Sequence, residues 1–488
     1  LTGLAGFDGE VFVVDNASTQ FNPPKRVSAI RNKNNQGYAF AANQAAVEST
    51  GGWLLFINPD VTLTDSLVKG MIMEAQEKGY DACSPLSSSK GYLLPLPSPF
   101  EVISQYTPFG KVLISRSTKA TLFGGCLLIK RSVFEEIGGW DEQFFLWFED
   151  ADLTKRLYDG GFNVGWLSTN VHHFGGSSFE NLTSEIKRKI FFHSLTQYAR
   201  KHWSKTTWWI AYLIAHRYGA GELLPDLTGR IDITIPNLKK NLLDEFLHKN
   251  NHFIENSENY TIVTSAVKPK ELLLYKKLYP YIRWIYISQN RGFSSTVNIG
   301  FRASAGKWLG TINDDVILTK NWTTDLLSNI PSGAGSVNPV IKRQSGEIES
   351  AGINILKRGK AQTITTRQEQ NITVTEATNG AAVVYSKAAL LNVGLFDERF
   401  GSYLEDIDLA LRLKRSNYKN YVVSKVSIIH LGQSTSSSVL RNQKSFLDFK
   451  NWIRVILKNW ALYDLILYFP AILIERLRNI SGIVKNLE

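Results

Sequence analysis

Carboxylates, which can bind cations and accept protons, occur twice in this chain together with asparagines, in one fixed order. Asn58-Pro59-Asp60 returns as Asn313-Asp314-Asp315, 255 residues later (313 − 58 = 255). Glu149-Asp150-Ala151-Asp152 returns as Glu405-Asp406-Ile407-Asp408, 256 residues later (405 − 149 = 256). A duplication retained only for stability would keep its apolar pattern and let the polar residues drift. The repeat therefore predicts two copies of one active-site framework.

Two of the repeated carboxylates, Asp60 and Asp315, follow predicted strands and are candidate ligands of a divalent cation. Mg²⁺ or Mn²⁺ prefers oxygen ligands and commonly takes one or two carboxylates together with substrate phosphates. Asn-Pro-Asp is also turn chemistry, but its return at the same place favours a cation site. His173 and His430 each precede a polar loop, and neutral imidazole is a good Mn²⁺ ligand beside a carboxylate. We therefore predict Asp60 with His173 and Asp315 with His430 as metal ligands, and the repeat register disfavours the adjacent His172.

The repeated acidic cluster supplies a candidate proton acceptor. Asp152 and Arg156 are spaced i, i+4 on one helix face, as are Asp408 and Arg412, which most simply makes a structural salt bridge. Acids at the start of a helix also suit its dipole, and this accounts for all three carboxylates without any chemistry. One carboxylate above a sugar could nevertheless take a proton from an attacking hydroxyl. The predicted catalytic bases are Asp150 and Asp406, and the predicted acceptor-binding residues are Glu149 and Glu405.

The predicted elements alternate between strands and helices, which indicates an α/β fold with a mostly parallel sheet and helices on both faces. In such sheets ligands gather at the carboxyl ends of the strands. The predicted strands are 11–14, 27–30, 53–57, 231–235, 260–265, 284–287 and 308–312, and the predicted helices are 38–48, 238–248 and 294–303.

Length and composition define the class of protein. A chain of 488 residues with a repeat near 255 exceeds one core and predicts two similar domains. Cys83 and Cys126 are the only cysteines, so a disulfide framework is excluded and two buried free thiols are expected. The net charge of +11 suggests anionic partners, and the absence of zinc-finger, RNP-type or long basic motifs makes nucleic acid the weakest of them. The repeat register places about one strand and one helix upstream of Leu1, with any targeting signal.

The repeat and the composition divide the chain into two catalytic domains, 1–185 and 229–440, each followed by a helical segment rich in Trp and basic residues. These helical segments are 186–228 and 441–488. The apolar stretch 460–477 is interrupted by Asp464 and Pro470, and a bilayer span needs about 20 apolar residues. Two alternatives remain open for it: an interfacial helix on anionic lipid or a helix packed on its own domain.

The order of the motifs resembles the family 2 inverting glycosyltransferases, especially the rhamnosyltransferase-like members that build bacterial surface polysaccharides. The motifs are Val-Val-Asp-Asn-Ala-Ser (13–18), Asn-x-Gly-Tyr (35–38), Asn-Pro-Asp (58–60), Gly-Gly-Cys (124–126), Glu-Asp-x-Asp and His-x-Gly-x-Ser. The resemblance covers both halves. It implies two tandem GT-A domains and a UDP-, dTDP- or GDP-linked sugar donor. It also implies a divalent cation, a catalytic Asp in the Glu-Asp motif, and a glycan or lipid-linked acceptor.

The same resemblance implies a set of residues that bind the nucleotide-sugar. They are Asp15, Asn35, Gly37, Asn43, Asn58, Asn290, Gly292, Asn298, Asn313 and Asp314. Two departures stand out. Asn58 and Asn313 occupy the place of the first Asp of the family's Asp-x-Asp motif, and Thr264-Ser265 stands in the second half where Asp15-Asn16 stands in the first.

We therefore predict a two-site inverting glycosyltransferase that is cytoplasmic and peripheral on the inner face of the membrane. The departure at Thr264-Ser265 motivates an alternative, in which one domain is active and the other only binds acceptor. A membrane scaffold without chemistry is a further alternative, which the doubled Glu-Asp-x-Asp disfavours. A nucleotidyltransferase is less consistent because no Gly-rich basic phosphate loop opens either half. Donor and acceptor specificity are expected to depend on the loops 84–121 and 332–378.

Overall fold

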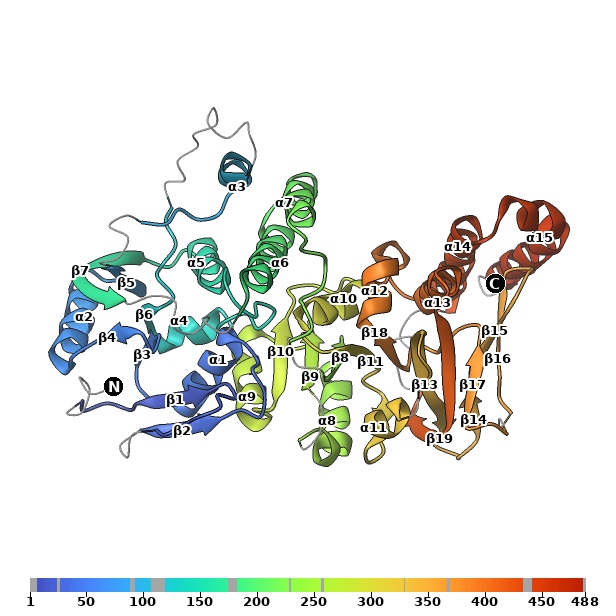
Figure 1. Cartoon of the computed structure of the whole chain (residues 1–488), viewed down its shortest axis with the longest axis horizontal. Helices are drawn as coiled ribbons and strands as arrows, with labels where there is room; N and C mark the ends of the chain where they lie inside the picture. The colour runs from blue at the N-terminus through green and yellow to red at the C-terminus, as the bar shows by residue number, and fades with distance from the viewer. Residues whose placement is uncertain are drawn as a thin grey trace. The chain divides into compact units, whose positions relative to one another are not determined.

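The chain divides into two compact units that interleave in sequence. A computed structural model describes residues 7–23, 27–87, 93–106, 119–173, 182–227, 230–255, 259–328, 330–366, 369–432 and 441–485. Unit 1 contains Leu1–Pro225 and Lys268–Tyr286, and unit 2 contains Asp226–Val267 and Ile287–Glu488 (Figure 1). The segment Lys268–Tyr286 is thus encoded in the second half but belongs by its contacts to unit 1.

Unit 1 has a five-stranded sheet in the order β3-β6-β5-β7-β4 and a separate parallel pair, β1-β2. Its strands are β1 (Phe12–Asp15), β2 (Ser28–Arg31), β3 (Trp53–Ile57), β4 (Val61–Thr62), β5 (Ala82–Ser87), β6 (Cys126–Lys130), β7 (Val164–His173) and β10 (Ile282–Tyr286). Its helices are α1 (Tyr38–Glu48), α2 (Asp65–Glu77), α3 (Pro99–Tyr106), α4 (Arg131–Glu136), α5 (Glu149–Asp159), α6 (Ser184–His202), α7 (Lys205–Arg217) and α9 (Pro269–Leu278). A buried ion pair of 2.7 Å between Lys276 of α9 and Glu142 fixes the interleaved segment in this unit.

Unit 2 is built around the strand order β9-β8-β11-β18-β13-β19-β12, with β14 on β13 and β17 on β19. Its strands are β8 (Ile231–Asn237), β9 (Asn259–Thr264), β11 (Trp308–Ile312), β12 (Val316–Ile317), β13 (Ala334–Arg343), β14 (Ile348–Ser350), β15 (Ile353–Leu356), β16 (Lys360–Thr363), β17 (Ile372–Thr375), β18 (Ala382–Ser386) and β19 (Lys419–His430). Its helices are α8 (Lys240–Ile254), α10 (Phe293–Ala303), α11 (Trp322–Leu327), α12 (Lys387–Val393), η4 (Glu398–Phe400), α13 (Glu405–Arg415), α14 (Arg441–Asn459) and α15 (Leu462–Lys485).

The expected α/β fold is confirmed, but the expectation of a mostly parallel sheet is wrong. Helix 38–48 and strands 53–57 and 308–312 have the predicted bounds. Both main sheets are mixed, because β6 runs antiparallel to β3 and β5, and β18 runs antiparallel to β11 and β13. Strand periodicity reports burial and carries no information about direction.

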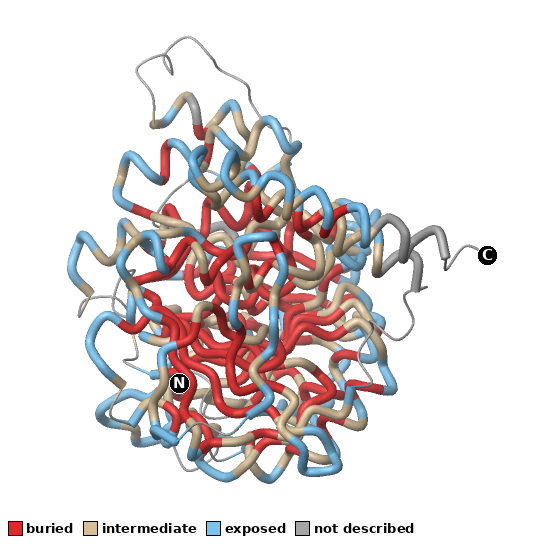
Figure 2. The backbone as a smooth tube through the Cα atoms, turned by 90° about the vertical axis from the view of Figure 1, so that its right-hand side faces the viewer, coloured by how far each residue is buried: buried red, intermediate tan, exposed pale blue. Residues whose placement is uncertain are grey.

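The core lies along these central strands. Leu127, Leu128 and Ile129 of β6 are fully buried, as are Val383 and Val384 of β18. Figure 2 shows the buried segments of the backbone in the interior and the exposed ones around them. Runs of buried apolar residues on consecutive positions are typical of a strand covered on both faces. Cys83 and Cys126 are free and buried in unit 1, as the sequence predicts.

A helical pair follows each sheet: α6 and α7 in unit 1, and α14 and α15 in unit 2. Thr183 and Ser204 cap the first two of these helices, since each side-chain oxygen accepts the backbone N–H three residues on. Pro470 lies inside α15. Among the described residues, no helix combines the length and the hydropathy that crossing a bilayer requires.

Candidate active sites

Strand pairing brings each predicted metal-ligand pair together. β4 runs antiparallel to β7 with Val61 opposite His173, so Asp60 Oδ1 lies 3.2 Å from His173 Nε2. β12 pairs in the same way with β19, and Asp315 Oδ1 lies 3.3 Å from His430 Nε2. The polar loops after the two histidines lie outside the described residues, apart from Leu431 and Gly432. Each unit thus has a carboxylate–imidazole pair at equivalent strands, which are β4 and β7 in unit 1 and β12 and β19 in unit 2.

The chemistry of these pairs fits a small divalent cation. Asp60 Oδ1 and both carboxylate oxygens of Asp315 are buried and, apart from the contacts with the histidines, have no hydrogen-bond partner among the described residues. Two ligands at right angles, each about 2.1 Å from an octahedral ion, lie about 3 Å apart, which matches the spacing of both pairs. The described residues contain no group of three or more candidate metal-ligating side chains. Two protein ligands are nevertheless sufficient where waters and substrate phosphates complete the shell.

The second pair has an additional carboxylate that the sequence did not predict. Glu349 of β14 lies 3.0 Å from His430 Nδ1 through Oε1 and 3.2 Å through Oε2. Burial lowers the pKa of His430, but Asp315 and Glu349 together raise it to about 9. A carboxylate behind a metal-binding imidazole fixes its orientation and its tautomer. In unit 1 His173 has an aromatic neighbour, and the ring centroids of Phe123 and His173 lie 5.0 Å apart.

Both acidic helices are entered through two consecutive residues in the left-handed backbone region. Trp147 and Phe148 have φ of 63° and 67° before α5, and Tyr403 and Leu404 have φ of 74° and 67° before α13. Bulky residues in this region cost about 1–3 kcal/mol each and are held by their surroundings. The holding residues are repeat equivalents in the helical segments: Ser194 donates to Leu146 O, and the Asn451 amide donates to three carbonyls of the entry to α13.

The predicted bases, Asp150 and Asp406, lie in the first turn of these helices against glycines. Asp150 Oδ1 accepts the Ala151 N–H at 2.7 Å, and Asp406 Oδ1 accepts the Ile407 N–H at 2.8 Å. Asp406 Oδ2 also accepts the Gly380 N–H at 3.0 Å. A Cβ atom added at Gly124 would lie 2.9 Å from the Asp150 Cβ. The chain between β5 and β6, and its equivalent before β18, therefore passes directly over the candidate bases.

Burial changes the protonation of this acidic pair in both units. Desolvation and the charge of Asp150 raise the pKa of Glu149 to about 8. Desolvation and the charge of Asp406 raise the pKa of Glu405 well above its usual range, and burial also raises the pKa of Asp406. A carboxylate with a raised pKa is a better proton acceptor near neutral pH. These shifts make the first turn of each acidic helix a candidate for proton transfer.

The third acid of each cluster is structural, as the i, i+4 spacing predicts. Asp152 contacts Arg156 at 2.8 Å, Lys201 at 2.6 Å and His202 at 2.8 Å. Burial alone would raise its pKa, but these three partners lower it well below its usual range. In unit 2 Asp408 is bound by the repeat equivalents, which are Arg412 at 2.8 Å, Lys458 at 2.9 Å and Asn459 at 3.0 Å. This network ties the acidic helix to the helical segment.

In each unit a short segment contacts both the Asp–His pair side and the acidic-helix side of the candidate site. This segment precedes β6 in unit 1 and β18 in unit 2. In unit 1 the Phe123 ring contacts His173, Gly124 lies against Asp150, and Gly125 O accepts the Asn58 N–H at 2.9 Å. In unit 2 Gly380 N donates to Asp406, and Ala381 O accepts the Asn313 N–H at 2.9 Å. Gly124 and Gly380 were not predicted as site residues, although their matching position in the repeat (380 − 124 = 256) could have identified them.

Several residues predicted to bind nucleotide-sugar instead shape the fold. The Asn43 amide exchanges hydrogen bonds with the backbone of Trp140 at 2.9 and 3.0 Å, and Asn298 does the same with Phe396 at 2.8 and 3.2 Å. Both asparagines are 1% exposed. The amides of both asparagines are therefore used to hold the backbone in place.

Asn35 and Asn290 form turns that lead into α1 and α10. Asn35 Oδ1 accepts the Gly37 N–H at 3.0 Å, and Asn290 Oδ1 accepts the Gly292 N–H at 2.8 Å. Gly37 has φ of +90°, and a Cβ there would lie 2.6 Å from Phe145 O. Gly292, with φ of +80°, meets Gly401 O in the same way at 2.8 Å. The glycines thus permit a close approach of the turn to the loop before each acidic helix.

Two more of the predicted nucleotide contacts, Asp15 and Asp314, lie at strand ends. Asp15 is 5% exposed, ends β1 and faces Arg31 Nε at 3.2 Å. Asp314 accepts from the Asn237 amide at 2.8 Å, and burial raises its pKa to about 6. In unit 2 Thr264 stands in the place of Asp15. Its hydroxyl donates to Asn237 Oδ1 at 2.8 Å, so Thr264 is part of the core and supplies no carboxylate there.

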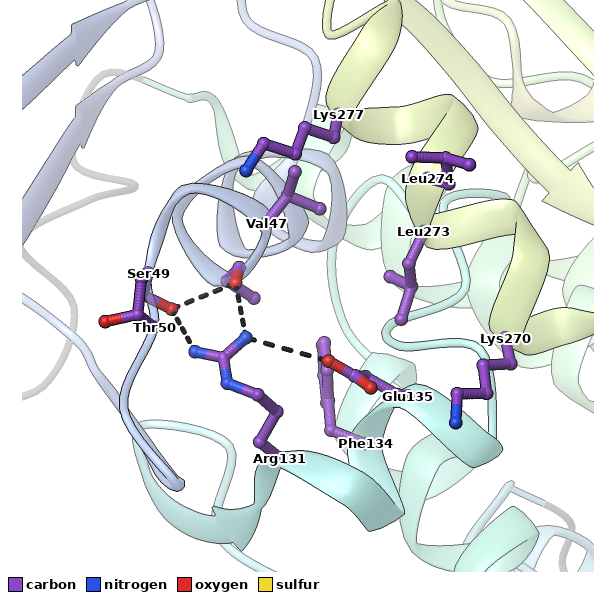
Figure 3. A pocket seen from close by; sticks show the side chains of 11 residues that line it. Val47, Ser49, Thr50, Arg131, Phe134, Glu135, Lys270, Leu273, Leu274 and Lys277 are labelled. Carbon is purple, nitrogen blue, oxygen red and sulfur yellow. Dashed lines mark hydrogen bonds and ion pairs between the residues drawn. The ribbon is translucent and has the colours of Figure 1, made fainter.

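A cavity of about 370 Å³ lies elsewhere in unit 1, between α1, α4 and α9 (Figure 3). Arg131 occupies one wall and donates to Gly51 O at 2.7 Å, Ala46 O at 3.1 Å and Ser49 Oγ at 2.8 Å. Its guanidinium is therefore held by the protein. The residues that line the cavity include none of the predicted site residues, and we assign it no ligand.

Comparison with known proteins gives two matches to one family in this chain. The model of Glycosyl transferase family 2 matches residues 7–138 and 269–393, which together exceed half of the chain. A second model, described as the N-terminal domain of galactosyltransferase, matches residues 113–175. The first model is found once in each half, as the internal repeat predicts.

Individual relatives are similar over shorter stretches. An N-acetylglucosaminyl-diphospho-decaprenol L-rhamnosyltransferase of Mycobacterium tuberculosis is 39% identical over 71 residues, which is 13% of this chain and 22% of that protein. The O-antigen biosynthesis protein RfbC of Myxococcus xanthus is 29% identical over 157 residues, 29% of this chain and 12% of that protein. The chain thus spans less than a quarter of either relative. The solved structure of GalNAc-T7 with UDP, GalNAc and Mn²⁺ superposes with a TM-score of 0.39 at 15% identity, covering 49% of each chain.

Proposed function

The chain belongs to glycosyltransferase family 2, and we propose that it carries two active sites that transfer sugars with inversion. The donors are nucleotide-diphosphate sugars, and the acceptor is a glycan or a lipid-linked oligosaccharide in cell-surface polysaccharide biosynthesis. The rhamnosyltransferase and O-antigen relatives support this substrate class. Where the acceptor is lipid-linked, the protein acts at the inner face of the membrane.

The single observation that carries the proposal is the joint repetition of two features. Each unit has an Asp–His pair at 3.2 or 3.3 Å in which the facing carboxylate oxygen is buried. Each unit also has an acidic helix that is entered through two left-handed residues. Fold stability explains neither feature, because each leaves buried charge or backbone strain in the same place in both copies.

Each residue then has a defined chemical task. Asp60 with His173, and Asp315 with His430, hold Mg²⁺ or Mn²⁺, which when bound offsets the negative charge of the departing diphosphate. Asp150 or Asp406 takes the proton of the attacking acceptor hydroxyl on its carboxylate. Glu149 or Glu405, the neighbouring acid, binds an acceptor hydroxyl. A single displacement at the anomeric carbon by the hydroxyl oxygen breaks the bond to the diphosphate and inverts the configuration.

The proposal is tested by replacing each base separately in the full chain. Asp150→Asn should abolish one transfer and Asp406→Asn the other, with losses of about 10²–10⁴-fold in kcat. Asp159→Asn is the matched control on α5, since Asp159 is more than half exposed and pairs with Lys155. Wild-type turnover in both base variants with every donor tested would show that the base assignments are wrong.

The alternative, in which unit 2 only binds acceptor, is favoured by one observation. Thr264 is fully buried and donates to Asn237, in the place where unit 1 has Asp15. Calorimetry on the full chain carrying Asp60→Ala, with UDP, dTDP or GDP and Mn²⁺, isolates the second site. A complete lack of nucleotide binding by this variant would favour the alternative, and binding would favour two active sites.

A further inference from the structure

The last helix of unit 2, α15, exposes a row of apolar side chains and buries two charged ones. Glu475 and Arg476 of α15 are 5% and 7% exposed, whereas Ile466 is 69% exposed. A surface helix ordinarily buries its apolar face and exposes its charges. The outward residues of α15 are Leu462, Tyr463, Ile466, Leu467, Phe469, Leu473, Ile474 and Leu477. Their spacing of three and four residues forms a stripe about 22 Å long.

The inward charges of α15 have partners on the hairpin formed by β15 and β16. Glu475 lies 3.3 Å from Arg358 and 3.4 Å from Lys360. Asp464 pairs with Lys357 at 3.0 Å. These contacts hold the two carboxylates of α15 against the hairpin, so the opposite face of the helix points outward.

The exposed charges on α15 and on the hairpin packed against it are cationic. The side chains of Lys357, Arg358 and Lys360 are 56%, 45% and 52% exposed, and that of Arg478 on α15 is 72% exposed. The two carboxylates of the described helix, Asp464 and Glu475, are turned toward these cations. An exposed apolar stripe bordered by Lys and Arg is complementary to a lipid surface that carries negative charge.

Unit 1 repeats the arrangement in a weaker form. α7, the repeat equivalent of α15 (462 − 205 = 257), leaves Trp209 and Leu213 52% and 64% exposed one turn apart. Lys205 and Arg217 stand at the two ends of α7. The feature is thus attached to both copies of the transferase domain.

We propose that the outward face of α15 binds an anionic membrane surface, with the helix lying in the plane of the interface. The face itself is established by exposure and charge. Only its purpose, holding the site near a lipid-linked acceptor, depends on the proposed function.

The test measures binding of the full-length protein to vesicles by co-sedimentation. Wild-type protein should bind vesicles of equal parts phosphatidylcholine and phosphatidylglycerol, bind phosphatidylcholine alone more weakly, and lose affinity as salt rises. The double variant Ile466→Glu, Ile474→Glu should weaken binding by about tenfold for each substitution, because each removes an exposed apolar side chain that membrane binding would bury. The matched control is Leu391→Glu on α12, where Leu391 is 58% exposed and lies outside the stripe.

Three outcomes would overturn the proposal. The first is unchanged vesicle binding by the double variant, and the second is an equal loss of binding in the Leu391 control. The third is a wild-type protein that binds no vesicles but is a dimer in sedimentation velocity, together with a double variant that is a monomer. Transfer to a soluble acceptor is measured on the same variants and should be unchanged. Vesicle binding that persists in Asp150→Asn and Asp406→Asn separates this proposal from the catalytic one.

Discussion

The sharpest test of the candidate bases is a matched pair of glycine substitutions. A Cβ at Gly124 would lie 2.9 Å from the Asp150 Cβ, whereas ordinary contact begins at 3.4 Å. The obstructing atom belongs to the start of the side chain, so Asp150 must move by about half an ångström. A misplacement of 1 Å at a reacting group costs about 10²-fold, which predicts a loss of about tenfold in kcat for Gly124→Ala.

The equivalent substitution in unit 2 should be milder. A Cβ at Gly380 would lie 3.3 Å from Asp406 Oδ2, the far end of the side chain, which can rotate by a few tenths of an ångström. Gly380→Ala should therefore reduce kcat of the second transfer by about threefold or less. The two substitutions are the same change at equivalent positions, and they differ in the atom that the new Cβ approaches and in its distance.

The assay uses backgrounds that silence one site. Gly124→Ala is measured with Asp406→Asn, and Gly380→Ala with Asp150→Asn, as product formed per second at saturating donor with Mn²⁺. Thermal unfolding checks that both proteins fold. Wild-type kcat for Gly124→Ala, or a larger loss for Gly380→Ala, would refute the placement of Asp150 and Asp406 as the bases.

Two further predictions follow from the acidic residues. Glu349→Gln should weaken Mn²⁺ binding at the second site by about 10–100-fold, measured by electron paramagnetic resonance titration of the full chain carrying Asp60→Ala. Glu347→Gln, with a side chain 73% exposed on the same hairpin, should leave the affinity unchanged, and an equal effect of both would contradict the role of Glu349. The pKa of Glu149 is raised from 4.5 to about 8 by burial and by Asp150, so the folded protein keeps a proton that the unfolded chain releases. The free energy of unfolding should therefore fall as pH rises through this window. In denaturant titrations Glu149→Gln should remove that fall, and an unchanged slope would exclude burial of this carboxyl.

The amino-acid sequence was sufficient to identify the repeat, the pairing of Asp60 with His173, and the structural role of Asp152. Repeated polar residues mark positions where composition is constrained beyond packing. The i, i+4 spacing of Asp152 and Arg156 specifies a contact because a helix has a fixed geometry. The proximity of Asp60 and His173 followed from both lying at strand ends, and the pairing of β4 with β7 brings them to 3.2 Å.

The tertiary structure alone decided which polar residues face the sites. Asn43 and Asn298 repeat as faithfully as the acids, yet their amides are used by backbone groups about 100 positions away in the chain. The repeat could not distinguish a residue kept for packing from one kept for a ligand, because both are invariant between the copies.

The sequence by itself determined two copies of one domain, the repeated carboxylates and histidines in them, and an α/β fold. Only the tertiary structure decided strand direction in the mixed sheets, the position of Glu349 behind His430, and the outward apolar face of α15. The physical reason is that periodicity and spacing report the burial and the local geometry of one element. Contacts between residues far apart in the chain, such as the 81 positions from Glu349 to His430, depend on how the elements pack.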